Sequence, residues 1–338
     1  MSLEISTLIP HIQSHFSINR SRAKCFCMML LSLIESRTVN LTRMSAMITG
    51  HAKTQSIYKR MRRFLKEMSF DPTDVARFIF TLLNIPKDAK IDLILDRTNW
   101  KFGKVHINIL YMAISYKGVG FPIFWNWVED KKKGNSDHFD RIDILETFIK
   151  AFGKERINVL SADREFIGDI WINWLKSEGI PYVIRLKENG QYLCNAQARV
   201  KLASQLFRSL KNNQSISIGT RDIGKKRTYN SHVTALRNEK GELVVLMHSE
   251  NILNPCALYR ERWQIELLFR MMKTGGFNLE STHVTDPERV DVLLAIVAIA
   301  TTLSAKAGLI HESIESTPIK KHGFKEMNKI RLGIENII

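Results

Sequence analysis

The 338-residue chain has few cysteines and no zinc-binding pattern among them. The four cysteines are too few and too scattered for a disulfide framework, and no Cys-x-x-Cys pair occurs. Its ten histidines form no His-Glu-x-x-His motif, and the His-x-Glu at 248–250 has no Cys-x-x-Cys to complete a zinc site, which argues against a zinc protease or a zinc deaminase. A reducing cytoplasm fits this composition best.

Long hydrophobic runs are also missing. The longest apolar run, residues 292–303, is shorter than the roughly 18 residues that a membrane-spanning helix needs. It therefore predicts a buried helix. The first residues lack the basic and apolar regions of a signal peptide, so we expect neither secretion nor a membrane partner.

Acidic residues are in short supply relative to basic ones. There are 34 Asp and Glu against 50 Lys and Arg, which gives a net charge of +16 and a pI near 9.7. A field of this sign attracts polyanions, and nucleic acid is the first candidate partner. The hydrophobic fraction of 44% and the charged fraction of 25% are typical of a folded chain, and the length predicts two or three modules.

The first 86 residues show helical periodicity and carry much of the positive charge. They contain twelve Lys and Arg against five Asp and Glu, a difference of +7. Predicted helices at 41–48 and 54–68, separated by a turn at 49–51, have the spacing of a helix-turn-helix. The second helix bears Lys59, Arg60, Arg62, Arg63 and Lys66. We predict a helical DNA-binding domain over 1–86, although a basic solvated helix face would give the same pattern.

From residue 87 the pattern changes to alternating strands and helices. Runs rich in β-branched and aromatic residues predict strands at 91–96, 105–115 and 119–128. A helix at 140–152, a strand at 157–163, a helix at 167–177 and a strand at 182–187 follow. This β-β-β-α-β-α-β order predicts an α/β catalytic core whose first part covers 87–189.

Short strands interrupt this order between residues 190 and 250. Strands predicted at 215–219, 229–237 and 243–249 indicate an inserted antiparallel β-module. Helices predicted at 255–274 and 287–307 complete the core within 251–310. Residues 311–338 form a basic C-terminal segment.

Three carboxylates, of Asp96, Asp163 and Glu266, are predicted to lie close together in the fold. Asp96 and Asp163 each end a predicted strand, and the carboxyl ends of neighbouring strands border the crevice where ligands bind. Glu266 lies on the later helix, and Tyr259, Arg262, Arg270 and Lys273 share its face. Three such acids can hold two Mg²⁺ ions about 4 Å apart. Either aspartate could instead cap the helix that follows it.

These residues carry a family resemblance. The spacing Tyr259-x2-Arg262-x3-Glu266-x6-Lys273, with LDRTNW around Asp96 and SADREFIG around Asp163, resembles the motifs of DDE transposases of the insertion sequence four family. The resemblance implies a ribonuclease-H-like core in which Asp96, Asp163 and Glu266 hold two Mg²⁺ ions, with Mn²⁺ as a substitute. Tyr259, Arg262 and Lys273, with Arg270 nearby, would grip phosphates.

The DREF segment includes Arg164 and Glu165, for which we expect a local ion pair that orients the strand end. Some family members pass through a hairpin intermediate and stack a flipped base on a Trp of the β-insertion. No Trp occurs here between Trp174 and Trp263, which puts that route in doubt.

The function that the resemblance implies is cut-and-paste transposition of a bacterial insertion sequence. The protein would bind terminal inverted repeats in double-stranded DNA, pair the two ends as a homodimer and join them to target DNA near the nucleoid. Two alternatives stay open: an inactive DNA-binding relative acting as a repressor, and a structure-selective nuclease of similar fold. Metal-dependent cleavage at specific ends separates the three.

Overall fold

The computed structural model describes residues 5–50, 52–103, 105–128, 136–197, 199–318 and 325–337. Two sequence predictions fall partly outside these residues. The turn predicted at 49–51 includes His51, and the basic segment at 311–338 includes residues 319–324 and Ile338.

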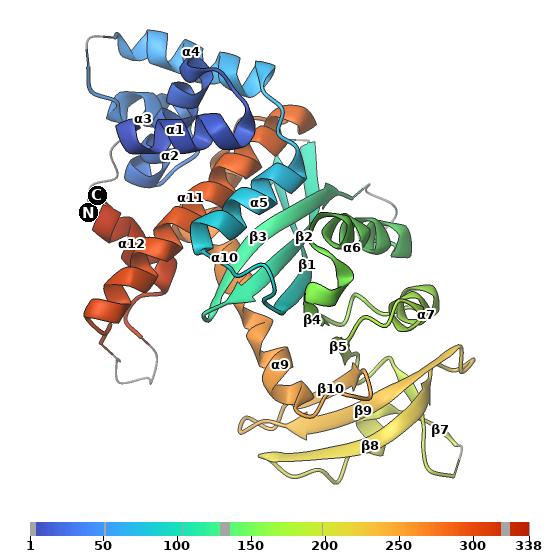
Figure 1. Ribbon diagram of the computed structural model, residues 1–338. Coiled ribbons are helices and arrows are strands. Elements are labelled where there is room, and N and C mark those ends of the chain that lie inside the picture. Colours follow the sequence, from blue (N-terminus) through green and yellow to red (C-terminus); the bar gives the residue numbers. More distant parts are fainter. Residues whose placement is uncertain are drawn as a thin grey trace.

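The N-terminal part consists of helices within the described residues (Figure 1, blue). Asn19, Asn40 and Asp71 cap the second, third and fifth helices by accepting hydrogen bonds from backbone N–H groups, which explains where these helices begin. Phe16, Phe26 and neighbouring phenylalanines pack together at their centre. The helices are α1 (Ile5–Phe16), α2 (Arg20–Ser36), α3 (Leu41–Met47), α4 (Thr54–Glu67) and α5 (Pro72–Leu83).

A ten-stranded sheet forms the centre of the molecule, with the strand order β3-β2-β1-β4-β5-β10-β9-β8-β6-β7. Strand β2 pairs antiparallel with both β1 and β3, whereas β4 is parallel to β1 and β5 is parallel to β4. The first five strands are β1 (Ile91–Phe102), β2 (Val105–Tyr116), β3 (Val119–Trp127), β4 (Ile157–Ala162) and β5 (Tyr182–Leu186).

The remaining strands continue this sheet. Strand β10 pairs antiparallel with β5 at one side and with β9 at the other. The strands predicted as an inserted module therefore extend the core sheet, because β5 offers β10 a free edge (Figure 1, yellow). They are β6 (Tyr192–Cys194), β7 (Val200–Leu202), β8 (Gln214–Ile223), β9 (Tyr229–Arg237) and β10 (Leu243–His248).

Helices cover both faces of the sheet. On one face lie α6 (His138–Phe152) and α7 (Asp169–Ser177), and Asp137 and Asp140 form a capping box at the start of α6. The other face is covered by α9 (Pro255–Glu261), α10 (Trp263–Arg270) and α11 (Pro287–Ile314). The short α8 (Ala203–Leu206) follows β7, and α12 (Lys329–Ile337) packs against α11.

Helix α11 joins the N-terminal helices to the sheet. It contacts α2, α4 and α5 as well as β3 (Figure 1, orange). By length and composition it could cross a membrane, but 78% of its most apolar window is buried inside the protein. The prediction of a buried helix is confirmed. One hydrophobic cluster runs from Leu8 in α1 to Ile334 in α12, so the N-terminal helices and the sheet share a core.

Candidate active site at the end of the β1–β4 pairing

The two aspartates lie at adjacent positions of neighbouring strands. The parallel pairing of β1 with β4 ends at Leu95 opposite Ala162, and Asp96 and Asp163 are the next residues of each chain segment. Asp163 follows β4 directly, as predicted. Asp96 does not end its strand, because β1 continues to Phe102 along β2. The two aspartates therefore meet where the pairing of β1 with β4 ends, and not at the carboxyl ends of both strands as predicted.

The helix predicted over 255–274 is interrupted in two places. Helix α9 ends at Glu261, α10 begins at Trp263, and a π-helical turn follows from Met271 to Gly275. Gly120 in β3 allows α10 to approach closely, since a Cβ there would lie 2.8 Å from the carbonyl oxygen of Gln264. This approach holds the segment that carries Arg262 and Glu266 against the sheet.

The Arg262 guanidinium bridges two of the predicted catalytic carboxylates. Its Nη1 donates to Asp96 Oδ2 at 3.1 Å, and its Nη2 donates to Glu266 Oε1 at 2.5 Å. Only 10% of its side chain is exposed, against 17% for Asp96 and 34% for Glu266. The guanidinium thus neutralises two acids in a partly dry site, where such pairs are strongest.

Burial raises the pKa of Asp96 to about 6, although the Arg262 charge and the Arg97 backbone N–H both act to lower it. Burial alone would lower the pKa of Arg262, but Tyr259, Asp96 and Asp163 raise it above its ordinary value. The ionised Asp96 carboxylate therefore depends on a neighbouring cation, which in this structure is Arg262.

Tyr259 makes the link to the third carboxylate. Its hydroxyl donates to Asp163 Oδ1 at 3.1 Å, and its ring lies 5.4 Å from the Arg262 guanidinium carbon. Burial raises the pKa of Tyr259 to about 12, so the phenol stays a hydrogen-bond donor. Asp163 does not cap α7, whose N-cap is Gly168. The capping interpretation of Asp163 is therefore wrong.

Lys273 and Arg270 are not part of this cluster. Lys273 Nζ donates to the Asn99 carbonyl at 2.8 Å and pairs with Glu280 at 2.8 Å. Asn99 lies three residues beyond Asp96, about 10 Å along the strand. Lys273 itself lies in the π-helical turn, seven residues or about 10 Å along the helix from Glu266. Arg270 is exposed beside the groove between α10 and the segment 325–330.

The donor chemistry suits a hard divalent cation, because Asp96, Asp163 and Glu266 offer carboxylate oxygens. Among the described residues, no three acidic, His or Cys side chains are close enough to share a metal ion. Arg262 lies between Asp96 and Glu266 in this arrangement. The three carboxylates are thus of the right type for Mg²⁺ or Mn²⁺. In this structure, however, the Arg262 guanidinium sets the distance between Asp96 and Glu266.

Glu165 pairs with Arg97, not with its neighbour Arg164 as expected. Arg97 Nε and Nη2 donate to the two Glu165 carboxylate oxygens at 3.2 and 3.3 Å. Sequence reasoning missed Arg97, although Asp-Arg occurs in both aspartate motifs, at 96–97 and at 163–164.

The cations of α4 lie on its outer side. The buried face of this helix consists of Ile57, Met61, Phe64 and Leu65. Lys59, Arg62, Arg63 and Lys66 are exposed, while Arg60 is half-buried and donates to Ser21. The two predicted helices exist as α3 and α4, and their use as a helix-turn-helix stays a prediction.

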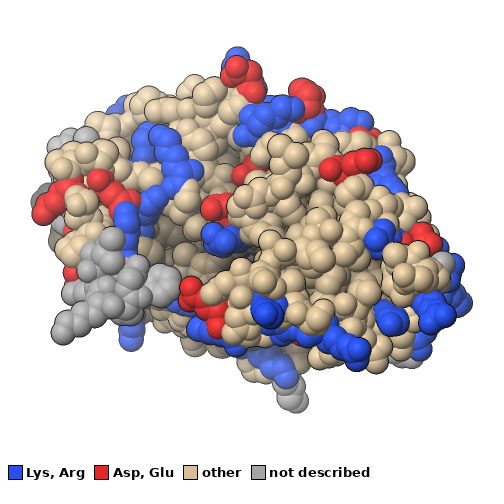
Figure 2. Space-filling view, turned by 90° about the horizontal axis from the view of Figure 1, so that it is seen from below, with Lys and Arg blue, Asp and Glu red and all other residues tan. Residues whose placement is uncertain are grey.

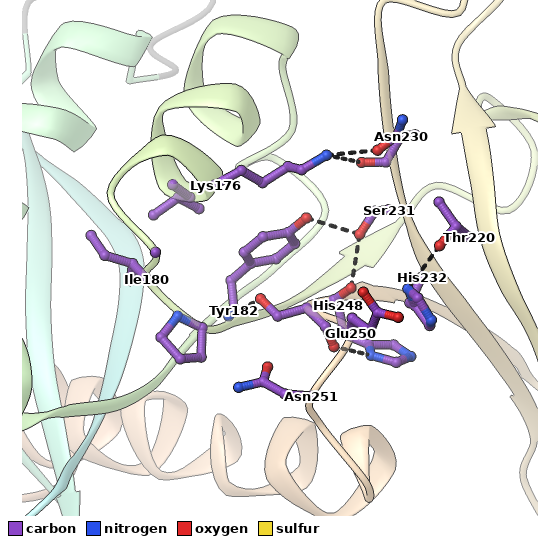
Figure 3. Close-up of a pocket in the computed structure, with 14 residues that line it drawn as sticks. Lys176, Ile180, Tyr182, Thr220, Asn230, Ser231, His232, His248, Glu250 and Asn251 are labelled. Carbon is purple, nitrogen blue, oxygen red and sulfur yellow. Dashed lines mark hydrogen bonds between the residues drawn. The ribbon is translucent and has the colours of Figure 1, made fainter.

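The molecular surface has two further features. Viewed from the side of β8–β10, acidic and basic side chains surround a hollow in the molecular surface (Figure 2). A separate cavity of about 280 Å³ lies between α7 and the strands β9 and β10 (Figure 3). There Tyr182 bonds Ser231 at 2.9 Å and Lys176 bonds Asn230 at 2.6 Å, so these polar groups satisfy one another. We interpret this cavity as a packing gap between α7 and the sheet, and not as a ligand site.

Residues 89–303, more than half of the chain, match the family model described as a transposase DDE domain. Among solved structures, the chain is similar to the piggyBac transposase in a cryo-EM structure of its synaptic complex with hairpin DNA. The identity is 12% and the TM-score 0.48, over 98% of this chain and 76% of that one. No curated protein sequence matches the chain.

Proposed function

The chain belongs to the family of transposases with a DDE domain, and from this premise we propose that it excises a bacterial insertion sequence and joins it to target DNA. The observation that carries the proposal is the cluster at the end of the β1–β4 pairing. There Arg262 links Asp96 to Glu266, and Tyr259 binds Asp163. Two side chains of the α9–α10 segment thus contact three acids that are far apart in sequence.

The part of the sheet from β3 to β5 would be the ribonuclease-H-like core. It contains three antiparallel strands followed by two strands parallel to the first. Asp96, Asp163 and Glu266 would hold two Mg²⁺ or Mn²⁺ ions. When bound, such ions neutralise charge on a phosphate and lower the pKa of an attacking water.

Arg262 would exchange partners during the reaction. Its guanidinium holds two carboxylates in the free protein, and its Nε is buried without a hydrogen-bond partner. A DNA phosphate is a bidentate acceptor of the kind that Arg prefers. Transfer of Arg262 to a phosphate would release Asp96 and Glu266, so that DNA binding and cation binding favour each other. Tyr259 would keep Asp163 oriented throughout.

The N-terminal helices would hold the DNA. Their exposed cations on α4 match the phosphate contacts that give most of the affinity for DNA. Terminal inverted repeats would be the recognised sequence, and two copies of the chain would pair the two ends in the bacterial cytoplasm. Two identical ends require two active sites, which is the reason to propose a homodimer.

The proposal is tested by mapping strand breaks. Purified protein and its Glu266→Gln variant are incubated with Mg²⁺ and with DNA that carries the sequences flanking the gene. Cuts at a pair of inverted repeats by the wild type alone would support the transposase and its third carboxylate together. Binding without cuts, in Mn²⁺ as well, would point to an inactive DNA-binding relative. Cuts without sequence preference would point to a nuclease.

A further inference from the structure

A second set of charged residues lies behind the aspartates. Arg97 donates two hydrogen bonds to Glu165 and a third, from Nη1, to Asn108 Oδ1 at 2.9 Å. The side chains of Arg97 and Glu165 are only 14% and 24% exposed. Two parallel N–H···O bonds fix both the distance and the orientation of the partners, which a single contact does not.

This pair is on the opposite face of the sheet from Asp96. Successive side chains of a strand alternate between faces, and β1 pairs regularly with β2 through Asp96 opposite Tyr111 and Arg97 opposite Leu110. Asp96 faces α9 and α10, where Arg262 meets it. Arg97 faces the side of α6. It therefore acts on the site from behind and does not contact DNA bound in front of the carboxylates.

Asp163 needs such support more than Asp96 does. Asp96 is fixed by strand pairing on one side, whereas Asp163 lies beyond the last residue of β4. The chain after Asp163 is anchored by Arg141 of α6, which is 5% exposed. Arg141 donates to the carbonyls of Glu165 and Ile167 at 3.2 and 3.4 Å.

We propose that Arg97 and Glu165 are positioning residues that set the separation of Asp96 and Asp163 for cation binding. The pair joins the residue after one aspartate to the residue two places after the other, across the end of the β1–β4 pairing. Catalytic carboxylates must be held to about half an ångström, which calls for such supporting contacts. This inference rests on the proposed function.

Removal of Arg97 should change the affinity for a divalent cation in opposite directions, depending on whether Arg97 positions the carboxylates or acts only through its charge. Arg97 carries a positive charge beside Asp96, so electrostatics alone predicts that Arg97→Gln binds a divalent cation more tightly. If Arg97 positions the carboxylates, the same change weakens binding. Loss of a residue that orients metal ligands typically costs 10- to 100-fold in metal affinity.

The experiment measures Mn²⁺ affinity by titration calorimetry on the full chain without DNA. We expect Arg97→Gln and Glu165→Gln to weaken Mn²⁺ binding about tenfold or more. Arg97→Lys, which keeps the charge but cannot form the two-pronged interaction, is expected to show a smaller loss. The Mn²⁺ concentration for half-maximal cleavage should rise in parallel, with DNA affinity unchanged.

Glu178→Gln is the matched control. It removes the carboxylate of the Lys154–Glu178 pair, which has the same 3.2 Å separation and lies at the other end of β4. We expect unchanged Mn²⁺ affinity. Thermal unfolding in EDTA shows whether each variant folds. If Arg97→Gln does not fold, Arg97→Lys carries the test, because it keeps the charge and simple electrostatics then predicts no change in Mn²⁺ affinity.

The two levels of the proposal fail in different ways. If the wild type binds Mn²⁺ and Arg97→Gln binds it equally or more tightly, the positioning role is overturned and the pair is an ordinary ion pair. If the wild type binds no Mn²⁺ and cuts no DNA, the proposed function is overturned, and the positioning role falls with it.

Discussion

Positive charge is used differently in the two halves of this molecule. On α4, Lys59, Arg63 and Lys66 are exposed, and no ion pair of theirs is observed among the described residues. Between α9 and α10, Arg262 is almost wholly buried and shared between two acids. Exposed charge acts at long range and is screened by salt, whereas buried charge acts on specific atoms. The first suits holding DNA, and the second suits chemistry on it.

The largest effect should come from the acids of the buried region. Glu266→Gln or Asp163→Asn should abolish cleavage, by roughly a thousandfold or more, because several kcal/mol of charge stabilisation are removed with little change in volume. DNA binding should persist, since α4 is untouched. Strand-break mapping and gel-shift titration measure the two properties. Glu261→Gln, one turn away, is the control, and cleavage by Glu266→Gln at the wild-type rate would refute the assignment.

Arg262→Met tests the buried cation itself. Removing it leaves two partly buried carboxylates without their partner, which costs about 3 kcal/mol. For a chain of this size, that lowers the melting temperature by about 4 °C in EDTA. Saturating Mn²⁺ should restore more stability to this variant than to the wild type, because no guanidinium competes with the ion. Equal Mn²⁺ stabilisation of both proteins in thermal unfolding would show that Arg262 does not compete.

Tyr259→Phe removes a single hydroxyl from the same region. The hydrogen bond to the Asp163 carboxylate disappears, while the ring beside Arg262 remains. A bond to a charged group contributes about 1.5–3 kcal/mol, so cleavage should slow roughly tenfold or more in single-turnover assays. Tyr58→Phe on α4, where Arg62 lies over the ring, is the matched control and should cut normally. A Tyr259→Phe rate equal to that of the control would count against the role of the hydroxyl.

The smallest effect per residue belongs to α4. Neutralising Lys59 and Arg63 to Gln should weaken DNA binding and reduce the slope of log K against log salt by about 0.9 for each phosphate that the variant no longer neutralises. Cleavage of DNA already bound should be unchanged. Lys24→Gln with Arg77→Gln removes equal charge from other helices. An unchanged slope for the α4 variant would exclude this helix from the DNA interface.

Local sequence patterns predicted most helices and strands, but they could not predict which strands pair when the partners are far apart in the sequence. The strand predicted at 229–237 has the same bounds in the structure, and a helix forms around Glu266 as predicted. The continuation of β1 past Asp96 depends on its pairing with β2. The mostly polar residues 97–101 do not by themselves predict a strand. The joining of β10 to β5 likewise depends on a neighbour distant in sequence.

The same limit applies to the site. Spacing placed Tyr259, Arg262 and Glu266 on one helix face, and the structure brings all three to the aspartates. Lys273 shares that spacing but lies seven residues beyond Glu266, about 10 Å along the helix, and contacts β1 at Asn99. Arg97 and Glu165 are 68 residues apart, and only the pairing of β1 with β4 brings them together, so no local sequence pattern could reveal their contact.

If α4 holds DNA as proposed, the shared core fixes the distance from the bound DNA to the carboxylates. Helix α11 is 28 residues long, about 42 Å, and it packs against both the N-terminal helices and the sheet. DNA held on α4 would therefore reach the carboxylates at a fixed number of base pairs from the recognised sequence. A base pair inserted between them would move the cut by one nucleotide into the element, because the protein measures from where it holds and not from where the element ends.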